Sequence, residues 1–278
     1  MTQTVSKNPE RQLRKSRITL PILFSILLIT STILPIYAQF QPLHQQQGPA
    51  VDKIGFKAFA VEIAPAALDD EQMDMYIFAL RTSAAKTIQN NPAVKIHQAP
   101  ATTVSIILNP APAPEGDLNP FSIREVRFAL QYLVNRDFVA NEIYQGLAVP
   151  MVTHISPFDY DYLTLYDLIR EMNINYDPQL AQIMIDNAME NAGAIKVGDR
   201  WNYNGNPIRL KFIIRVEDER RDIGDTIASE LDKLGFTVER VYQQFGPAIQ
   251  KVYVTDPQLF EWHLYTEGFG KGSAQKYD

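Results

Sequence analysis

The sequence contains no cysteine and only four histidines in 278 residues. The missing cysteine excludes a disulfide scaffold, a thiolate zinc site and a cysteine nucleophile. The four histidines are scattered, so we expect no multi-histidine metal site. A basic surplus is also missing, since the formal net charge is −6. Phosphate binding needs an excess of Lys and Arg, so nucleic acid is not expected to be the main partner.

Signatures of catalysis are missing as well. The patterns GxSxG, GxxxxGK[ST], HExxH and GxGxxG do not occur. The run Gly268–Gly272 is glycine-rich. A phosphate-binding loop is followed by a helix, and no helix is expected after this run. We therefore expect no enzyme, no catalytic residue, no metal and no cofactor.

The amino-terminal region has a distinct pattern. The first 17 residues hold five basic side chains against one acid, and residues 18–38 carry no charge. A basic stretch followed by an apolar run and Ala38 predicts a secretory signal over residues 1–38. The run also has the roughly 20 residues that span a bilayer, so an uncleaved membrane anchor is the open alternative. In both cases residues 39–278 are expected to face outward.

Four regions are expected along the chain, beginning with this signal or anchor. Residues 39–52 are rich in Gln and predict a flexible linker. Residues 53–116 predict a partial first-lobe α/β segment that ends in a Pro-Ala crossing. The expected strands there are 54–59, 73–78 and 102–109, and the expected helices begin near Pro65 and Thr82.

Residues 117–278 are expected to form the fourth and largest region, a lobe that contains a βαβ unit. Ser122 and Glu125 have the spacing of a capping box at the start of a helix. Asp177-Pro178 predicts the start of another helix, and Asn204-Gly205 predicts a tight hairpin turn. Residues 208–242 alternate as a strand, then show helical periodicity, then begin a second strand, which predicts a parallel βαβ unit. The acidic run 217–219 is expected to favour the amino terminus of that helix.

The last expected strand covers residues 260–265. Trp262 is expected in the core, and Tyr265 on the opposite and freer face.

An ordered series of segments resembles a known family. The segment NPFSIREVRFALQYLVNRDFVANEIYQGLAVP (119–150) resembles a helical segment of the family-5 extracellular solute-binding proteins, the peptide- and nickel-binding subunits of ABC importers. LAQIMIDNAMENAG (180–193) is similar to a later helix of that family. EWHLYTEGFG (261–270) is similar to its tryptophan-containing strand segment. The resemblance covers most of residues 53–272.

The resemblance implies an α/β fold, namely a periplasmic-binding-protein-like lobe (type II, cluster C) with a mixed sheet and flanking helices. The two-lobe architecture would be incomplete, because family members have a larger first lobe, and an N-terminal hydrophobic helix would precede it. The implied function is that of an exported component that binds peptide-like or other small solutes by lobe closure. The implied partners are ABC permease subunits, and also the membrane if residues 18–38 stay uncleaved.

The resemblance also implies ligand-binding residues: Tyr265, Phe269 and, more weakly, Glu267. Phe269 matches the family's aromatic residue in this segment. In peptide binders of the family an acid three residues further on receives the ligand's amino group, but Gly272 stands there. An alternative remains open, in which the chain is a membrane-anchored surface domain with a structural or interaction role and no transport activity.

Overall fold

The structure is a computed structural model that describes residues 51–98 and 102–270. The expected signal or anchor over 1–38, most of the linker and Gly272 lie outside the described residues. The chain divides after Ala58 into two units, and the following description concerns the second, Phe59–Asp278. Within the described part of the chain, no helix is both long and apolar enough to cross a bilayer.

Residues 59–98 form two short helices, α2 (Ala64–Asp69) and α3 (Thr82–Ile88). Both expected helices are therefore confirmed, but both expected strands, 54–59 and 73–78, are wrong. Met75 and Ile77 are 73% and 75% exposed. A strand is stabilised by neighbours across the sheet, and apolar periodicity without such neighbours does not produce one.

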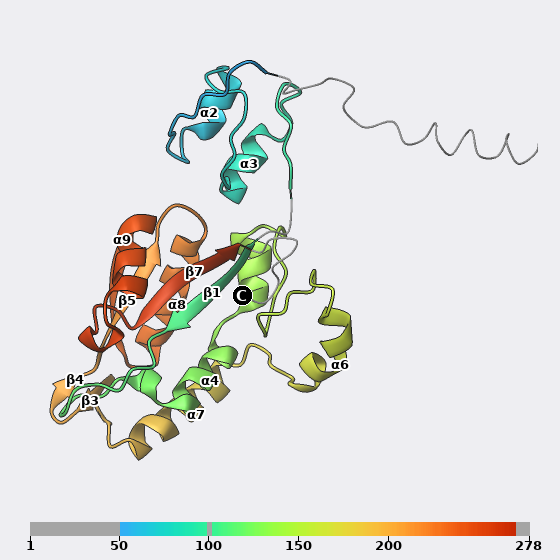
Figure 1. Cartoon of the computed structure of the whole chain (residues 1–278). Helices are drawn as coiled ribbons and strands as arrows, with labels where there is room; N and C mark the ends of the chain where they lie inside the picture. Colours follow the sequence, from blue (N-terminus) through green and yellow to red (C-terminus); the bar gives the residue numbers. More distant parts are fainter. Residues whose placement is uncertain (1–50, 99–101, 271–278) are drawn as a thin grey trace, which may run out of the picture. The chain divides into compact units, whose positions relative to one another are not determined.

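A four-stranded mixed sheet forms the centre of the remaining chain (Figure 1). Its order is β1 (Thr102–Leu108), β7 (Leu264–Gly270), β5 (Arg209–Arg215) and β6 (Thr237–Gln243). β1 runs antiparallel to β7, whereas β7, β5 and β6 are parallel. The expected βαβ unit is confirmed, with α8 (Arg220–Lys233) between β5 and β6. The mixed sheet with flanking helices agrees with the expected fold class.

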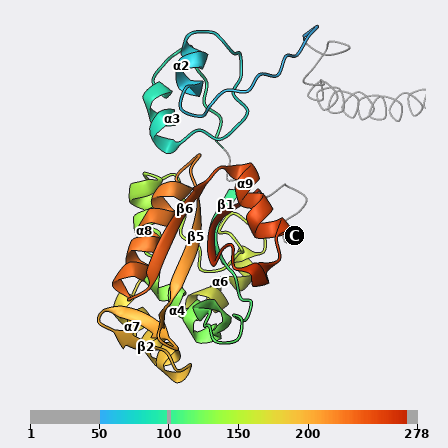
Figure 2. The ribbon, with the colours of Figure 1, turned by 90° about the vertical axis from the view of Figure 1, so that its left-hand side faces the viewer.

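The central strand β5 is covered on both faces, as Figure 2 shows for α8 and α9 (Phe245–Ile249). Phe212 and Ile214 belong to the large core cluster that includes α8. Ile213 belongs to a smaller cluster on the other face with α9 and the π-helical turn η3 (Gln250–Val254). The alternation in the sequence predicts one buried face, but a central parallel strand is buried on both.

Helices α4 (Arg124–Leu133) and α7 (Pro178–Asn191) pack together within the large cluster. Asp177 caps α7 as expected, because its side chain accepts the Leu180 N–H at 2.9 Å. The predicted capping box at Ser122 is wrong. Ser122 lies in the 3-10 turn η1 (Pro120–Ser122) and donates to the Asn119 carbonyl, while Ile123 occupies the cap position of α4.

Shorter elements complete the described chain. α5 (Arg136–Phe138) continues into the π-helical turn η2 (Val139–Ile143), and α6 (Tyr162–Glu171) follows. A small antiparallel sheet contains β2 (Ile195–Val197), β3 (Arg200–Tyr203) and β4 (Asn206–Pro207). Its predicted turn is confirmed, since Asn204 and Gly205 have φ angles of 49° and 82°.

The last strand begins later than predicted. The 3-10 turn η4 (Pro257–Leu259) ends at Phe260, whose φ of 47° is left-handed. The strand β7 therefore starts at Leu264 rather than at residue 260. Trp262 is 5% exposed and lies in the smaller core cluster, as predicted.

Candidate functional site

The sheet has a topological switch point at the carboxyl ends of β5 and β7. From β5 the chain passes through α8 to β6 on one side, and then through α9 and η3 to β7 on the other side of β5. The two connections cover opposite faces of the sheet. Connections that diverge in this way leave a crevice at the strand ends, which is where open α/β sheets bind ligands.

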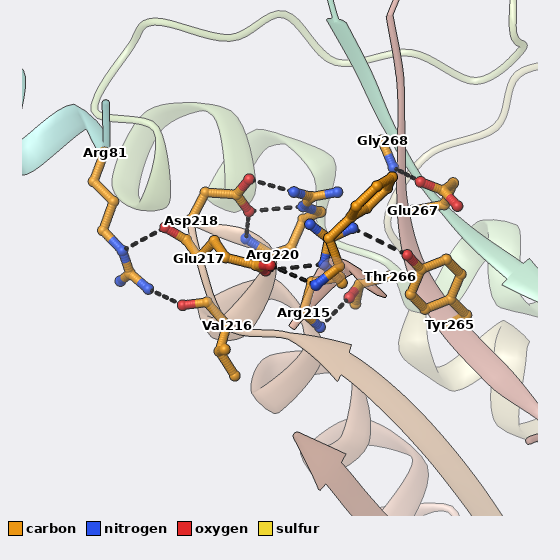
Figure 3. A network of polar contacts seen from close by, with 11 residues as sticks. Arg81, Arg215, Val216, Glu217, Asp218, Arg220, Tyr265, Thr266, Glu267 and Gly268 are labelled. Carbon is orange, nitrogen blue, oxygen red and sulfur yellow. Dashed lines mark hydrogen bonds and ion pairs between the residues drawn. The ribbon is translucent and has the colours of Figure 1, made fainter. Parts of the chain in front are cut away.

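Two buried arginines lie at this crevice, each paired with an acid two residues away (Figure 3). Arg215 is 3% exposed, and its Nε donates to Glu217 Oε2 at 2.9 Å. Arg220 is 7% exposed, and its Nε and Nη2 donate to the two oxygens of Asp218 at 2.7 and 2.5 Å. A guanidinium this deeply buried requires a charged or hydrogen-bonding partner, and the acids of the β5–α8 turn supply it.

The pairs also fix the protonation of the acids. Burial alone would raise the pKa of Asp218, but the hydrogen bonds and charge of Arg220 outweigh it and hold that pKa below its ordinary value. For Glu217 burial again acts upward, and the bonds from Arg215 and the Phe245 N–H lower its pKa overall. Both carboxylates therefore remain ionised at neutral pH.

Tyr265, the first predicted ligand residue, is fully buried. The expectation that it is freely accessible on a face opposite Trp262 is therefore wrong, because Tyr265 and Trp262 lie together in the smaller core cluster, on the face opposite Leu264. Residues of α9 and η3 cover this face, which the alternating pattern could not indicate. Its hydroxyl accepts Arg215 Nη1 at 3.2 Å, and burial raises its pKa. Tyr265 thus lies behind Arg215 and orients it.

The other two predicted residues lie further along β7. Glu267 is 4% exposed and accepts the Tyr253 hydroxyl and the Gly268 N–H, each at 2.6 Å. Phe269 is 46% exposed. Among the three predicted side chains, Phe269 is the accessible one, whereas Glu267 and Tyr265 are buried.

Sequence reasoning did not identify Arg215, Asp218 and Arg220 as site residues. It treated the acids only as favourable charges at a helix terminus. The available signal was the run of three acids at 217–219, flanked by Arg215 and Arg220, at the end of a predicted parallel strand. Its meaning depended on β7 lying beside β5, and these strands are 50 residues apart in the sequence.

A broad cleft opens over these groups. Its lining includes both charged pairs, Glu267, Phe269 and Phe245. Phe245 is 58% exposed, and the Arg215 guanidinium lies 4.8 Å from its ring centre. Among the described residues, no group of three His, Asp or Glu side chains is arranged to hold a metal ion. The site offers hydrogen-bonding charges and two exposed rings, which suits the binding of a polar solute.

Comparison with known proteins gives one family and several similar folds. The family profile described as bacterial extracellular solute-binding proteins, family 5 Middle, matches residues 37–276. No curated protein matches the sequence significantly.

Three of the similar solved structures illustrate the fold. An oligopeptide ABC transporter periplasmic binding protein from Thermotoga maritima, bound to mannohexaose, has a TM-score of 0.60 and 19% identity, over 77% of this chain and 39% of its own. NikZ from Campylobacter jejuni with Ni(L-His) has a TM-score of 0.53 and 16% identity, over 77% of this chain and 38% of its own. AppA from Bacillus subtilis with a nonapeptide has a TM-score of 0.53 and 15% identity, over 79% of this chain and 40% of its own. At these identities the similarity establishes the fold alone, and this chain spans about two fifths of each of those proteins.

Proposed function

The chain belongs to the bacterial extracellular solute-binding proteins of family 5, and we propose that it acts as the substrate-binding component of an ABC importer. It would take up peptide-like solutes outside the cell and deliver them to permease subunits. The similar structures contain a nonapeptide, a mannohexaose and a nickel–histidine complex, and the first of these motivates a peptide-like solute. The basic stretch and uncharged run of residues 1–38 support export, with a cleaved signal or a retained anchor.

The observation that carries this proposal is the crevice at the carboxyl ends of β5 and β7. We expect Phe269 to contact the solute, because it is the exposed residue among the three predicted ones. Arg215 and Glu267 would form the polar floor, each fixed by a tyrosine hydroxyl at 3.2 and 2.6 Å. Groups held in this way lose little conformational entropy when a solute binds. Tyr265 contributes by holding Arg215.

The experiment is a binding titration with thermal unfolding as a second readout. An equimolar mixture of synthetic tri- to pentapeptides is titrated into the purified chain and into the Phe269→Ala variant. A solute at 100 times its dissociation constant stabilises the native state by about 2.7 kcal/mol, so the unfolding midpoint should rise. Loss of an aromatic contact should weaken binding by roughly tenfold.

The matched control is Phe128→Ala. Phe128 is 40% exposed, similar to Phe269, but lies on α4 outside the lining of the cleft. We expect the Phe128→Ala variant to bind the peptide mixture with the same affinity as the unchanged chain. Equal affinities for the Phe269 and Phe128 variants would show that the solute does not contact Phe269.

One observation favours the alternative role as a surface interaction domain. None of the ten residues of α6 is buried, and Leu163 and Leu168 are 82% and 62% exposed. A helix of this length is marginal in water on its own, so an apolar partner surface would stabilise it. A chain that is retained in the membrane fraction and shows no peptide-dependent shift of its melting midpoint would fit this role.

A further inference from the structure

Residues 59–98 are joined to the turn between β5 and α8 by three hydrogen bonds. Arg81 Nη2 donates to the Val216 carbonyl at 2.6 Å, and its Nε donates to the Glu217 carbonyl at 3.3 Å (Figure 3). The Thr82 N–H donates to Glu219 Oε1 at 2.5 Å. Thr82 and Glu219 are each 7% exposed. Charged groups take part in all three bonds, which makes them stronger than neutral ones.

Apolar packing contributes little to this junction. Neither core cluster of the described chain contains a residue from 59–98. The buried apolar residues of this segment are few and mostly small, namely Ala64, Ala67 and Ile88. The burial of apolar surface is usually what holds one part of a protein against another. Since little apolar surface is buried here, the polar bonds of Arg81 and Thr82 carry most of the attachment.

The turn that receives these bonds is also the rim of the crevice. Glu217 offers its carbonyl to Arg81 while its carboxylate accepts Arg215 and the Phe245 N–H. Arg81 contacts the turn through two backbone carbonyls, so these bonds do not depend on the conformation of any side chain in the turn. Leu80 and Thr82 line the same cleft as Phe269. The contact therefore places residues of 59–98 beside the charged pairs.

We propose that Arg81 is a positioning residue, which clamps segment 59–98 to the β5–α8 turn and thereby gives the crevice a second wall. Thr82 and Glu219 complete the clamp. Only the statement that the wall retains a solute rests on the proposed function. The clamp itself is a property of the unliganded chain.

The first test is hydrogen exchange, measured by mass spectrometry on the full chain without solute. Arg81→Ala removes both carbonyl contacts, and hydrogen bonds to charged groups contribute enough for a roughly tenfold or larger acceleration of exchange over residues 82–96. Exchange in β5 and α8 should be unchanged. Arg81→Lys keeps one donor that can reach a carbonyl but loses the fork, so it should give an intermediate rate.

Lys86→Ala is the matched control, because Lys86 is an exposed cation of the same helix, α3. In the Lys86→Ala variant, residues 82–96 should exchange at the same rate as in the unchanged chain. Equal rates over 82–96 for the Arg81→Ala and Lys86→Ala variants would overturn the clamp. Glu219→Gln gives an independent check, since it keeps the acceptor but removes its charge, and should accelerate exchange less than Arg81→Ala.

The second test measures affinity for the same peptide mixture. If the wall retains the solute, Arg81→Ala should weaken binding about tenfold and Arg81→Lys should restore part of it. If Arg81→Ala accelerates exchange over residues 82–96 but leaves the peptide affinity unchanged, segment 59–98 is clamped by Arg81 but does not act as a second wall for the solute. Absence of binding by the unchanged chain would count against the proposed function, and the exchange rates would still decide on the clamp.

Discussion

At the scale of single residues, His263 makes the stability of the fold depend on pH. Its ring Nδ1 accepts the backbone N–H of Lys211 at 3.1 Å, and its backbone N–H donates to the Lys211 carbonyl at 2.8 Å. The acceptor role requires a neutral ring. Burial, with a smaller effect from the charge of Lys211, lowers the pKa of His263 to about 4. The ring of His263 therefore bonds to β5 only in its unprotonated form, whereas the backbone bond does not depend on protonation.

The sign of the effect follows from this lowered pKa. Between pH 6.5 and 4 the unfolded chain binds a proton at His263 that the folded chain does not, so the free energy of unfolding falls as the pH falls. We expect about 2 kcal/mol of this loss between pH 7.5 and 4.5. His263→Asn, which can accept but not titrate, should remove that part of the pH dependence. Urea unfolding at the two pH values measures it.

The control for this variant is His97→Asn at an exposed position. The acids Glu217 and Asp218 have lowered pKa values and also lose stabilisation on acidification. Since they are present in every variant, the difference between the two substitutions isolates His263. A pH dependence that is equal in both variants would mean that His263 does not contribute.

At the scale of elements, the contact of α8 with β5 depends on Gly224. A Cβ built there would lie 2.7 and 2.8 Å from side-chain atoms of Ile214. Alanine is about 1 kcal/mol better than glycine inside a helix, but the clash opposes it. Forced overpacking of a core costs roughly 1–3 kcal/mol. We expect Gly224→Ala to lower the free energy of unfolding by about 1–2 kcal/mol, measured by urea denaturation.

Gly246→Ala in α9 is the same substitution at a site where, apart from its two chain neighbours, nothing lies within 4 Å of the Cβ. The gain in helix propensity is opposed there only by the following Pro247, so we expect a smaller loss of stability than for Gly224→Ala. A larger loss for Gly224→Ala would identify the Ile214 contact as the cause. A stabilising effect of both substitutions would show that α8 can move away from β5 without cost.

Elements with strong local patterns were predictable from the sequence. The apolar stripe of α4, the cap at Asp177 and the βαβ unit depend on periodicity and capping within a few residues. Ser122 failed as a cap, because Asn119 organises a turn there, and its side chain accepts the Phe121 N–H at 3.1 Å. The strand expected at 54–59 failed because none of the strands in residues 51–98 and 102–270 pairs with it.

The site was predictable only in part for the same reason. Phe269 and Glu267 belong to the segment 261–270, whose resemblance to a known family is visible in the sequence alone, and their contact with a solute stays a prediction. The pairing of Arg215 with Tyr265 depends on which strands become neighbours, and local pattern does not determine that. Long-range contacts of this kind become visible only in the folded sheet.

At the scale of the whole molecule, the distribution of the core predicts where the described chain opens first. Both apolar clusters, including the partly buried residues packed against them, lie within residues 104–265. Regions with few buried apolar contacts open at lower free energy than the core, and proteases cut the open form. In brief digestion with trypsin, cuts within residues 59–270 should begin after Arg81, Lys86 and Lys95, and also after Arg170 in α6, none of whose residues is buried. The fragments that begin at Ile96 and at Glu171 should persist.

The Arg81→Ala variant makes this test specific. If Arg81 holds segment 59–98, the variant should be cut faster after Lys86 and Lys95. Cleavage after Lys233 should be unchanged, because that residue is the exposed end of α8, a helix whose other face is held by the core. First cuts after Lys233, or equal acceleration at all three sites, would mean that the segment opens together with the core and that the molecule unfolds as one cooperative unit. Mass spectrometry of the fragments, sampled over the digestion, distinguishes these outcomes.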